Sequence, residues 1–330
     1  MDLSLKRVLV TGADGFIGSH LVELLAGVSG RVRALAQYNS FNEWGWLEGL
    51  PCLSDLEIVT GDIRDAHFCQ ELLKDIDVVF HLAALIPIPY SYRAPDSYVE
   101  TNIRGTLNLC QAARAAGVER FVQTSTSEVY GTAQYVPIDE RHPLSPQSPY
   151  SATKIGADAI ALSFFHSFAL PVVIARPFNT YGPRQSARAV IPTIITQIAA
   201  GSREVRLGEL AATRDFTYVE DTCQGLLSVA QLDGGSGEVF NIGSNHEISV
   251  EDLVALIGRV IGVPARAVVD AERLRSGTSE VMRLRCDTTK LDRATAFRPA
   301  VPLAEGLART VRWFQDPANL RRYKTHLYNV

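Results

Sequence analysis

The sequence predicts an α/β fold in which helices cover both faces of a doubly wound parallel sheet, followed by a smaller C-terminal region. Short β-branched runs alternate with longer helical patterns through about residue 175. A glycine-rich turn follows the first run, and polar residues follow several later ones. The chain has 330 residues, 46% of them hydrophobic, and can bury a substantial core.

Six short runs predict strands, and the intervals between them predict helices. The strands are predicted at Arg7–Val10, Arg31–Ala36, Leu56–Thr60, Val78–Leu82, Arg120–Thr124 and Val172–Ala175. The helices are predicted at Ile17–Ala26, Ala66–Leu73, Ser97–Ala116 and Pro149–Phe168. Ser148 is the expected N-cap of the last helix, with Pro149 at its first position.

After Arg176 the pattern becomes irregular and several prolines interrupt it, which predicts a substrate-binding domain. Segments near 215–225 and 239–242 are regular enough to return to the first domain. We therefore expect a dinucleotide-binding domain at 1–175, joined by 215–243, and a second, interleaved domain at 176–214 and 244–330.

Composition excludes several classes of protein. A net charge of -4 and a pI near 6.0 give no general attraction for nucleic acid or anionic lipid. Five cysteines without a C-x-x-C pair suggest neither a disulfide framework nor a metal site. A strand pattern begins at Arg7, which leaves no room for a signal peptide, and the apolar stretch 155–175 is interrupted by Asp158 and Pro171. We expect a cytoplasmic protein without a membrane span.

The turn Thr11–Gly18 follows the first strand and opens a helix, as in Rossmann-type folds. Glycines suit the tight turn, the close approach of a phosphate and the packing of helix on strand. The helix N-terminus then offers unpaired N–H groups to a pyrophosphate. The predicted cofactor-binding residues of this turn are Gly12, Asp14, Gly15, Phe16, Ile17 and Gly18.

Further residues lie at the carboxyl ends of strands, where an open parallel sheet binds ligands. They are Asp62, Ile63, Leu82, Ala83 and Ala84. Asp62 either accepts a hydrogen bond from an adenine amino group or is a surface turn residue, and the two alanines either admit the dinucleotide or pack in the core. His81 is expected to be a satisfied strand-end histidine.

The second strand ends in the segment 35–40, which carries neither an acid for a ribose 2′-hydroxyl nor an arginine for a 2′-phosphate. We predict NAD because no positive charge is supplied, while NADP stays open.

Tyr150 and Lys154 stand four residues apart on a predicted helix and share one face. A tyrosine pKa near 10 must fall by roughly 3 units for the phenol to act as a base at neutral pH. An ammonium about 4 Å away provides roughly that stabilisation, and a positive nicotinamide ring would add to it. Both residues are predicted to contact the cofactor.

Together with the glycine-rich turn and this pair, the segments 102–106 and 214–221 resemble the extended short-chain dehydrogenase/reductase superfamily of nucleotide-sugar enzymes over nearly the whole chain. The segment 125–131 is similar to the 4,6-dehydratases, especially the Thr-Ser-Glu form of GDP-mannose 4,6-dehydratases; epimerases typically lack the glutamate. Segments 38–47 and 85–90 resemble bacterial dehydratases of legionaminic-acid-type pathways, which implies UDP-N-acetylglucosamine as substrate. Many dTDP-glucose dehydratases have aspartate where this chain has Ser127.

The resemblance implies a role for each residue. Tyr150 takes the C4 hydroxyl proton as hydride passes to the nicotinamide, and Thr126 hydrogen-bonds the same oxygen. Glu128 removes the C5 proton, water leaves C6 with help from Glu128 or Ser127, and the hydride returns to C6. If Glu128 is only a solvated loop carboxylate, a 4-epimerase is the alternative. A GDP-sugar dehydratase and a non-catalytic dinucleotide-sensing regulator also stay open.

Five residues are candidates for the sugar nucleotide's diphosphate, although any one of the arginines is equally well explained as a solvated surface residue. They are Asn179, Arg184, Arg188, Arg214 and Arg275. By fold-level analogy, the helices near 97–116 and 149–168 form a homodimer interface.

Overall fold

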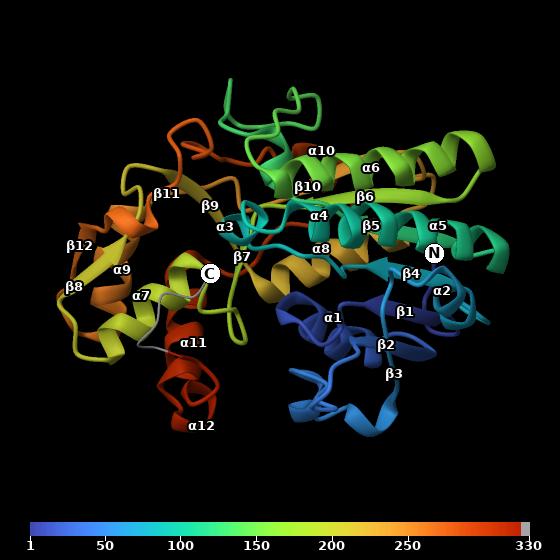
Figure 1. Cartoon of the computed structure of the whole chain (residues 1–330), viewed down its shortest axis with the longest axis horizontal. Helices are drawn as coiled ribbons and strands as arrows, with labels where there is room; N and C mark the ends of the chain where they lie inside the picture. The colour runs from blue at the N-terminus through green and yellow to red at the C-terminus, as the bar shows by residue number, and fades with distance from the viewer. Residues whose placement is uncertain (325–330) are drawn as a thin grey trace.

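The computed structural model describes residues 1–324, and within them seven strands form one parallel sheet (Figure 1). Its order is β10-β6-β5-β4-β1-β2-β3. The strands are β1 (Arg7–Thr11), β2 (Arg31–Gln37), β3 (Leu56–Gly61), β4 (Val78–His81), β5 (Arg120–Thr124), β6 (Val172–Pro177) and β10 (Val239–Ile242). All six predicted strands are confirmed; the fourth ends one residue early and the sixth runs on to Pro177.

Two groups of helices cover the sheet, because alternate residues of each strand point to opposite faces. In β1, Val8 and Val10 pack in one hydrophobic cluster and Leu9 in another. Helices α1 (Phe16–Ala26) and α8 (Val219–Gln231) cover the first face, and α2 (Ala66–Leu72), α5 (Gly105–Ala116) and α6 (Pro149–Phe168) cover the second (Figure 1).

The predicted helix at 97–116 is instead three consecutive segments. They are α4 (Pro95–Tyr98), the π-helical η3 (Val99–Arg104) and α5. Asn102 of η3 donates to the oxygen of Leu85 at 3.0 Å and to Thr153 Oγ1 at 3.0 Å, and it accepts from the Leu85 N–H. The wider helical turn thus ties the loop after β4 to α6.

Helix α6 has the predicted bounds because its start is fixed by local chemistry. The Ser148 side chain accepts from the Ser151 N–H at 3.1 Å, and the Ser151 hydroxyl accepts from the Ser148 N–H, which forms a capping box. Pro149 occupies the first turn, and Ala169 ends the helix in a left-handed conformation. Tyr150 is therefore held at a rigid helix N-terminus.

A smaller region is built mainly from the chain after β6 and lies at the left in Figure 1. Its strands are β7 (Asn179–Tyr181), β9 (Thr213–Tyr218) and β11 (Glu247–Ser249) in one sheet, and β8 (Glu204–Leu207) and β12 (Arg266–Val269) in another. Its helices are α7 (Val190–Ala199), α9 (Val250–Ile261), α11 (Leu303–Gln315) and α12 (Pro317–Leu320), whereas α10 (Thr289–Thr295) packs against β10 and α8 of the first region. Short elements elsewhere are α3 (Ile88–Ser91), η1 (Leu47–Gly49), η2 (Leu53–Asp55), η4 (Ser127–Tyr130) and η5 (Ala271–Arg273).

The chain crosses between these regions more than once. Of the segment expected to return to the first domain, α8 packs beside α1 and β10 pairs with β6, whereas β9 pairs with β7 and β11. The exact domain boundaries stay a prediction. Within residues 1–324, no helix has both the length and the apolar character needed to cross a bilayer.

Candidate active site

A cavity of about 830 Å³ opens at the carboxyl ends of the large sheet's strands and extends to the smaller region. Every predicted site residue except Arg184 lines it. The glycine-rich turn, the loops after β3, β4 and β5, the start of α6 and the arginines of the second region therefore share one space.

The glycine-rich turn has no room for side chains at two positions. Gly12 has φ +66°, and a Cβ there would lie 2.9 Å from the backbone of Ala83. A Cβ on Gly18 would lie 2.1 Å from the Gly12 oxygen. No side chain caps the N-terminus of α1, and Phe16 and Ile17 line the cavity. This cradle fits the pyrophosphate of a dinucleotide.

The loops after β3 and β4 are fixed by hydrogen bonds. Arg64 Nε donates to both oxygens of Asp62, at 3.0 and 2.9 Å, and these bonds lower the pKa of that carboxyl. His81 contacts Thr11 Oγ1 at 2.8 Å and Thr106 Oγ1 at 3.0 Å. Burial, with the charge of Lys154, lowers the pKa of His81 to about 3, so this histidine is neutral and structurally satisfied.

The proposed catalytic side chains converge where β5 meets α6. Tyr150 and Lys154 are buried, and Lys154 Nζ donates to the Thr124 oxygen at 2.7 Å. Thr126 hydrogen-bonds the Tyr150 phenol and also accepts from the Glu128 N–H at 3.2 Å. Glu128 lines the cavity, while Ser127 is 3% exposed.

The protein's own residues raise the pKa of Tyr150, which is the reverse of the predicted fall. Burial is the main cause and the charge of Glu128 adds to it, while the hydrogen bond from Thr126 acts in the opposite direction. Burial also lowers the pKa of Lys154 to about 8, so its ammonium is itself disfavoured. Positive charge from a bound ligand would therefore favour ionisation of Tyr150.

Asp158 lies one helical turn beyond Lys154 and is a buried site residue that the sequence predictions did not include. The spacing is a usable signal, because Tyr150, Lys154 and Asp158 recur at intervals of four residues. Its Oδ2 accepts from Ser125 Oγ at 2.7 Å and from Arg176 Nη2 at 3.1 Å. Burial raises the pKa of Asp158, and the charge of Arg176 opposes that shift. The carboxylate in turn favours the charged form of Lys154.

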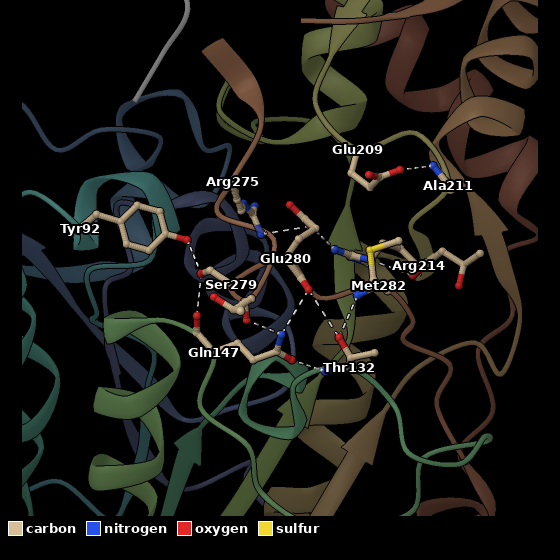
Figure 2. A network of polar contacts seen from close by, with 12 residues as sticks. Tyr92, Thr132, Gln147, Glu209, Ala211, Arg214, Arg275, Ser279, Glu280 and Met282 are labelled. Atoms are coloured by element: carbon tan, nitrogen blue, oxygen red, sulfur yellow. Dashed lines mark hydrogen bonds and ion pairs between the residues drawn. The ribbon is translucent and has the colours of Figure 1, made fainter. Parts of the chain in front are cut away.

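Arg214 and Arg275, which are predicted to bind the diphosphate, both contact Glu280 (Figure 2). Glu280 Oε1 lies 3.1 Å from Arg214 Nη2 and 3.6 Å from Arg275 Nη1. Burial lowers the pKa of Arg214, whereas the charges of Glu128 and then Glu280 favour the guanidinium. Glu280 lies in a loop between η5 and α10 that has no periodic pattern, so no local sequence signal identifies it.

The other three candidates for the diphosphate differ in position. Asn179 and Arg188 line the cavity, and the buried Oδ1 of Asn179 has no hydrogen-bond partner within residues 1–324. Arg184 Nη1 instead contacts Glu23 Oε2 of α1 at 2.6 Å, outside the cavity lining. The structure thus brings four of the five candidates together.

Known proteins resemble the chain over nearly its full length. Residues 9–310 match the family model for GDP-mannose 4,6 dehydratase. The dTDP-glucose 4,6-dehydratase of Streptomyces antibioticus is 36% identical over 314 residues, which span 94% of this chain and 92% of that protein.

Solved structures of two enzymes are also similar. The dTDP-glucose 4,6-dehydratase from Streptomyces venezuelae, with NAD and TYD bound, is 34% identical with a TM-score of 0.86, covering 95% of this chain and 98% of that one. The UDP-N-acetylglucosamine 4-epimerase from Methanobrevibacter ruminantium M1, in complex with UDP-N-acetylmuramic acid, is 31% identical with a TM-score of 0.83, covering 95% and 99%. The chain therefore belongs to the GDP-mannose 4,6-dehydratase family of the extended short-chain dehydrogenase/reductase superfamily, and it is a nucleotide-sugar 4,6-dehydratase.

Proposed function

We propose that this protein binds NAD and converts UDP-N-acetylglucosamine to its 4-keto-6-deoxy product. The observation that carries the dehydratase chemistry is the place of Glu128. Glu128 lines the same cavity as Tyr150 and Arg214, and its charge acts on both of them. A 4-epimerase would need Tyr150 and Thr126 but no base there.

The residues have the following proposed roles. Tyr150 accepts the proton of the C4 hydroxyl, and Thr126 hydrogen-bonds the same oxygen. Bound NAD would supply a reversible hydride acceptor between C4 and C6, so that the overall reaction loses only water. The C4 ketone acidifies C5–H, Glu128 removes that proton, and the C6 hydroxyl leaves as water after protonation by Glu128 or Ser127.

The charge balance supports binding of a dinucleotide before Tyr150 ionises. Tyr150 and Lys154 are both buried, and burial disfavours the charged form of each. A positive nicotinamide beside the phenol would favour the phenolate, and Asp158 would keep Lys154 protonated. The cavity therefore fits a cofactor that is oxidised when the sugar arrives.

The choice of UDP-N-acetylglucosamine rests on the segments 38–47 and 85–90. The second segment lines the cavity through Leu85, Ile86, Pro87, Ile88 and Pro89, which gives the sugar pocket an apolar wall. The 4-epimerase from Methanobrevibacter ruminantium M1 adds support, because its name specifies the same nucleotide sugar. The similarity to dTDP-glucose dehydratases makes dTDP-glucose the competing substrate.

Mass spectrometry of the protein incubated separately with UDP-N-acetylglucosamine, dTDP-glucose and GDP-mannose tests both the reaction and the substrate. We expect loss of one water from UDP-N-acetylglucosamine. Product of unchanged mass but altered configuration would favour the epimerase, and dehydration of dTDP-glucose alone would overturn the substrate.

Solvent deuterium exchange tests Glu128. In Glu128→Gln we expect reduced nicotinamide to form while exchange at C5 is lost, because the amide cannot take the proton. Glu128→Asp keeps a carboxylate and should retain part of the exchange. Full exchange in Glu128→Gln would remove Glu128 as the base.

We also propose a cytoplasmic homodimer. All five cysteines are unpaired, as a reducing compartment requires. The exposed residues of η3 and α6 include Val99, Ala152 and Ala159, which suit close packing against a second copy, and Glu100 and Arg104 add charges beside them. Sedimentation tests this, and a monomer would contradict it.

A further inference from the structure

An acidic side chain lies at the end of β2 although the sequence there contains none. Asp14 belongs to the glycine-rich turn after β1, yet its Oδ2 accepts from the N–H of Gln37, the last residue of β2, at 3.1 Å. The N–H of Ala13 also donates to the Leu35 oxygen at 3.1 Å, which holds the turn against β2. Asp14 and Gln37 both line the cavity.

The end of β2 is the place where dinucleotide-binding folds discriminate between cofactors. An acid there hydrogen-bonds the ribose 2′-hydroxyl, whereas a cation there accommodates a 2′-phosphate. A phosphate monoester carries about -1.5 to -2 charges near neutral pH, so a carboxylate at the same place repels it. This reasoning rests on the proposed function, in which the cavity binds a nicotinamide dinucleotide.

The backbone of Asp14 is also held in position by the loop after β2. The backbone carbonyl oxygen of Asp14 accepts from the Trp46 N–H at 3.1 Å, and Gly45 packs so closely that a Cβ on it would lie 3.1 Å from the Asp14 Cβ. Burial raises the pKa of Asp14, while hydrogen bonds from the N–H groups of Gln37 and of Asp14 itself favour ionisation. The loop after β2 therefore helps to position Asp14, although the loop does not itself supply the acid.

Two arginines at this end of the molecule, Arg64 and Arg322, are already engaged. Arg64 follows β3, which pairs with β2, but Asp62 holds its guanidinium. Arg322 donates to the Gly45 oxygen at 3.0 Å and lies over the Trp46 ring, and it does not line the cavity. Neither guanidinium offsets the charge of Asp14 within the cavity.

We propose that Asp14 is the specificity-determining residue that makes this protein select NAD over NADP. This acid belongs to the turn after β1. It takes the role of the acidic residue that dinucleotide-binding folds usually have after β2. Its hydrogen bond to Gln37 aims the carboxylate at the ribose side of the cavity.

Isothermal titration of the nucleotide-free protein with NAD and with NADP tests the proposal without any sugar turnover. Wild type is expected to bind NAD at least about tenfold more tightly, because juxtaposed like charges are unfavourable. Asp14→Asn keeps an oxygen acceptor for the Gln37 N–H but removes the charge. We expect it to tighten NADP binding about tenfold or more, with a much smaller change for NAD.

A matched control is Glu48→Gln. Glu48 Oε1 accepts from the Trp44 N–H at 2.9 Å in the same loop, but Glu48 does not line the cavity. This variant also loses one carboxylate while keeping an acceptor, and its ratio of NAD to NADP affinity should equal that of wild type.

Equal affinities of wild type for NAD and NADP would overturn the proposal, as would an unchanged ratio in Asp14→Asn. If Asp14→Asn does not fold, wild type titrated with ADP-ribose and with its 2′-phosphate decides the question, and equal binding refutes the role of Asp14. Binding of neither dinucleotide would instead overturn the proposed function and this inference with it.

Discussion

Replacing Asp158 by asparagine should destabilise the protein strongly, because it would leave a buried guanidinium without its counter-charge. The Asp158 and Arg176 side chains are only 4% and 5% exposed, and Asp158 Oδ2 lies 3.1 Å from Arg176 Nη2. Removing one partner of a buried pair typically costs about 3 to 5 kcal/mol. For a chain of this size that corresponds to a fall in Tm of roughly 4 to 7 °C.

Urea unfolding followed by circular dichroism measures this loss, and an exposed ion pair provides the matched control. Glu119 contacts Lys6 at 2.7 Å, with side chains 45% and 28% exposed. Glu119→Gln should cost less than about 1 kcal/mol, because solvent screens the pair.

The double variant Asp158→Asn with Arg176→Met provides an independent check. Removing the orphaned charge should recover part of the stability lost in Asp158→Asn. Two results would refute the buried-charge reasoning. One is a loss of unfolding free energy in Asp158→Asn that is no larger than the loss in Glu119→Gln. The other is a double variant that is less stable than Asp158→Asn by the full amount that Arg176→Met alone costs.

Three further predictions concern the cavity. Tyr150→Phe should abolish formation of reduced nicotinamide on addition of substrate, measured by absorbance, while cofactor binding persists; an unchanged rate would refute the role of the phenol. The pKa of Lys154 is about 8 in the folded protein, against 10.5 in the unfolded chain. The charged ammonium therefore destabilises the folded state below pH 8, and the free energy of unfolding of wild type rises as pH increases from 8 to 10.5. Lys154→Met should therefore raise the free energy of unfolding by up to about 3 kcal/mol at pH 7, with the gain shrinking towards pH 10; a gain that does not depend on pH would contradict this. Arg214→Gln should raise KM for the sugar nucleotide at least about tenfold, whereas Glu280→Gln, which frees Arg214, should lower it; parallel changes in both variants would argue against competition between Glu280 and the diphosphate.

Much of the fold follows from local sequence chemistry. Helix α6 has its predicted bounds because Ser148 and Pro149 determine its start whatever surrounds it. The π-helical segment 99–104 was not predicted, because the apolar pattern of its residues is compatible with an ordinary helix and the wider turn depends on the contacts of Asn102.

Side-chain partners were harder to predict than backbone elements. Arg184 follows β7 and Arg214 lies in β9, yet one contacts Glu23 of α1 and the other contacts Glu280. Each pairing joins residues far apart in the chain, so no local spacing reveals it. The residues after β2 offer no acid beside the cofactor, whereas the Asp14 carboxylate reaches the end of β2 from the turn after β1.

The position of β10 at the edge of the large sheet has a consequence for biosynthesis. Its partner β6 ends at Pro177, and β10 begins at Val239, so the ribosome must synthesise α7, β8, β9 and α8 before the sheet can be completed. Until then the edge of β6 presents unpaired N–H and C=O groups, a template for pairing with other chains. A nascent or truncated chain that ends near residue 177 is therefore expected to aggregate through this edge.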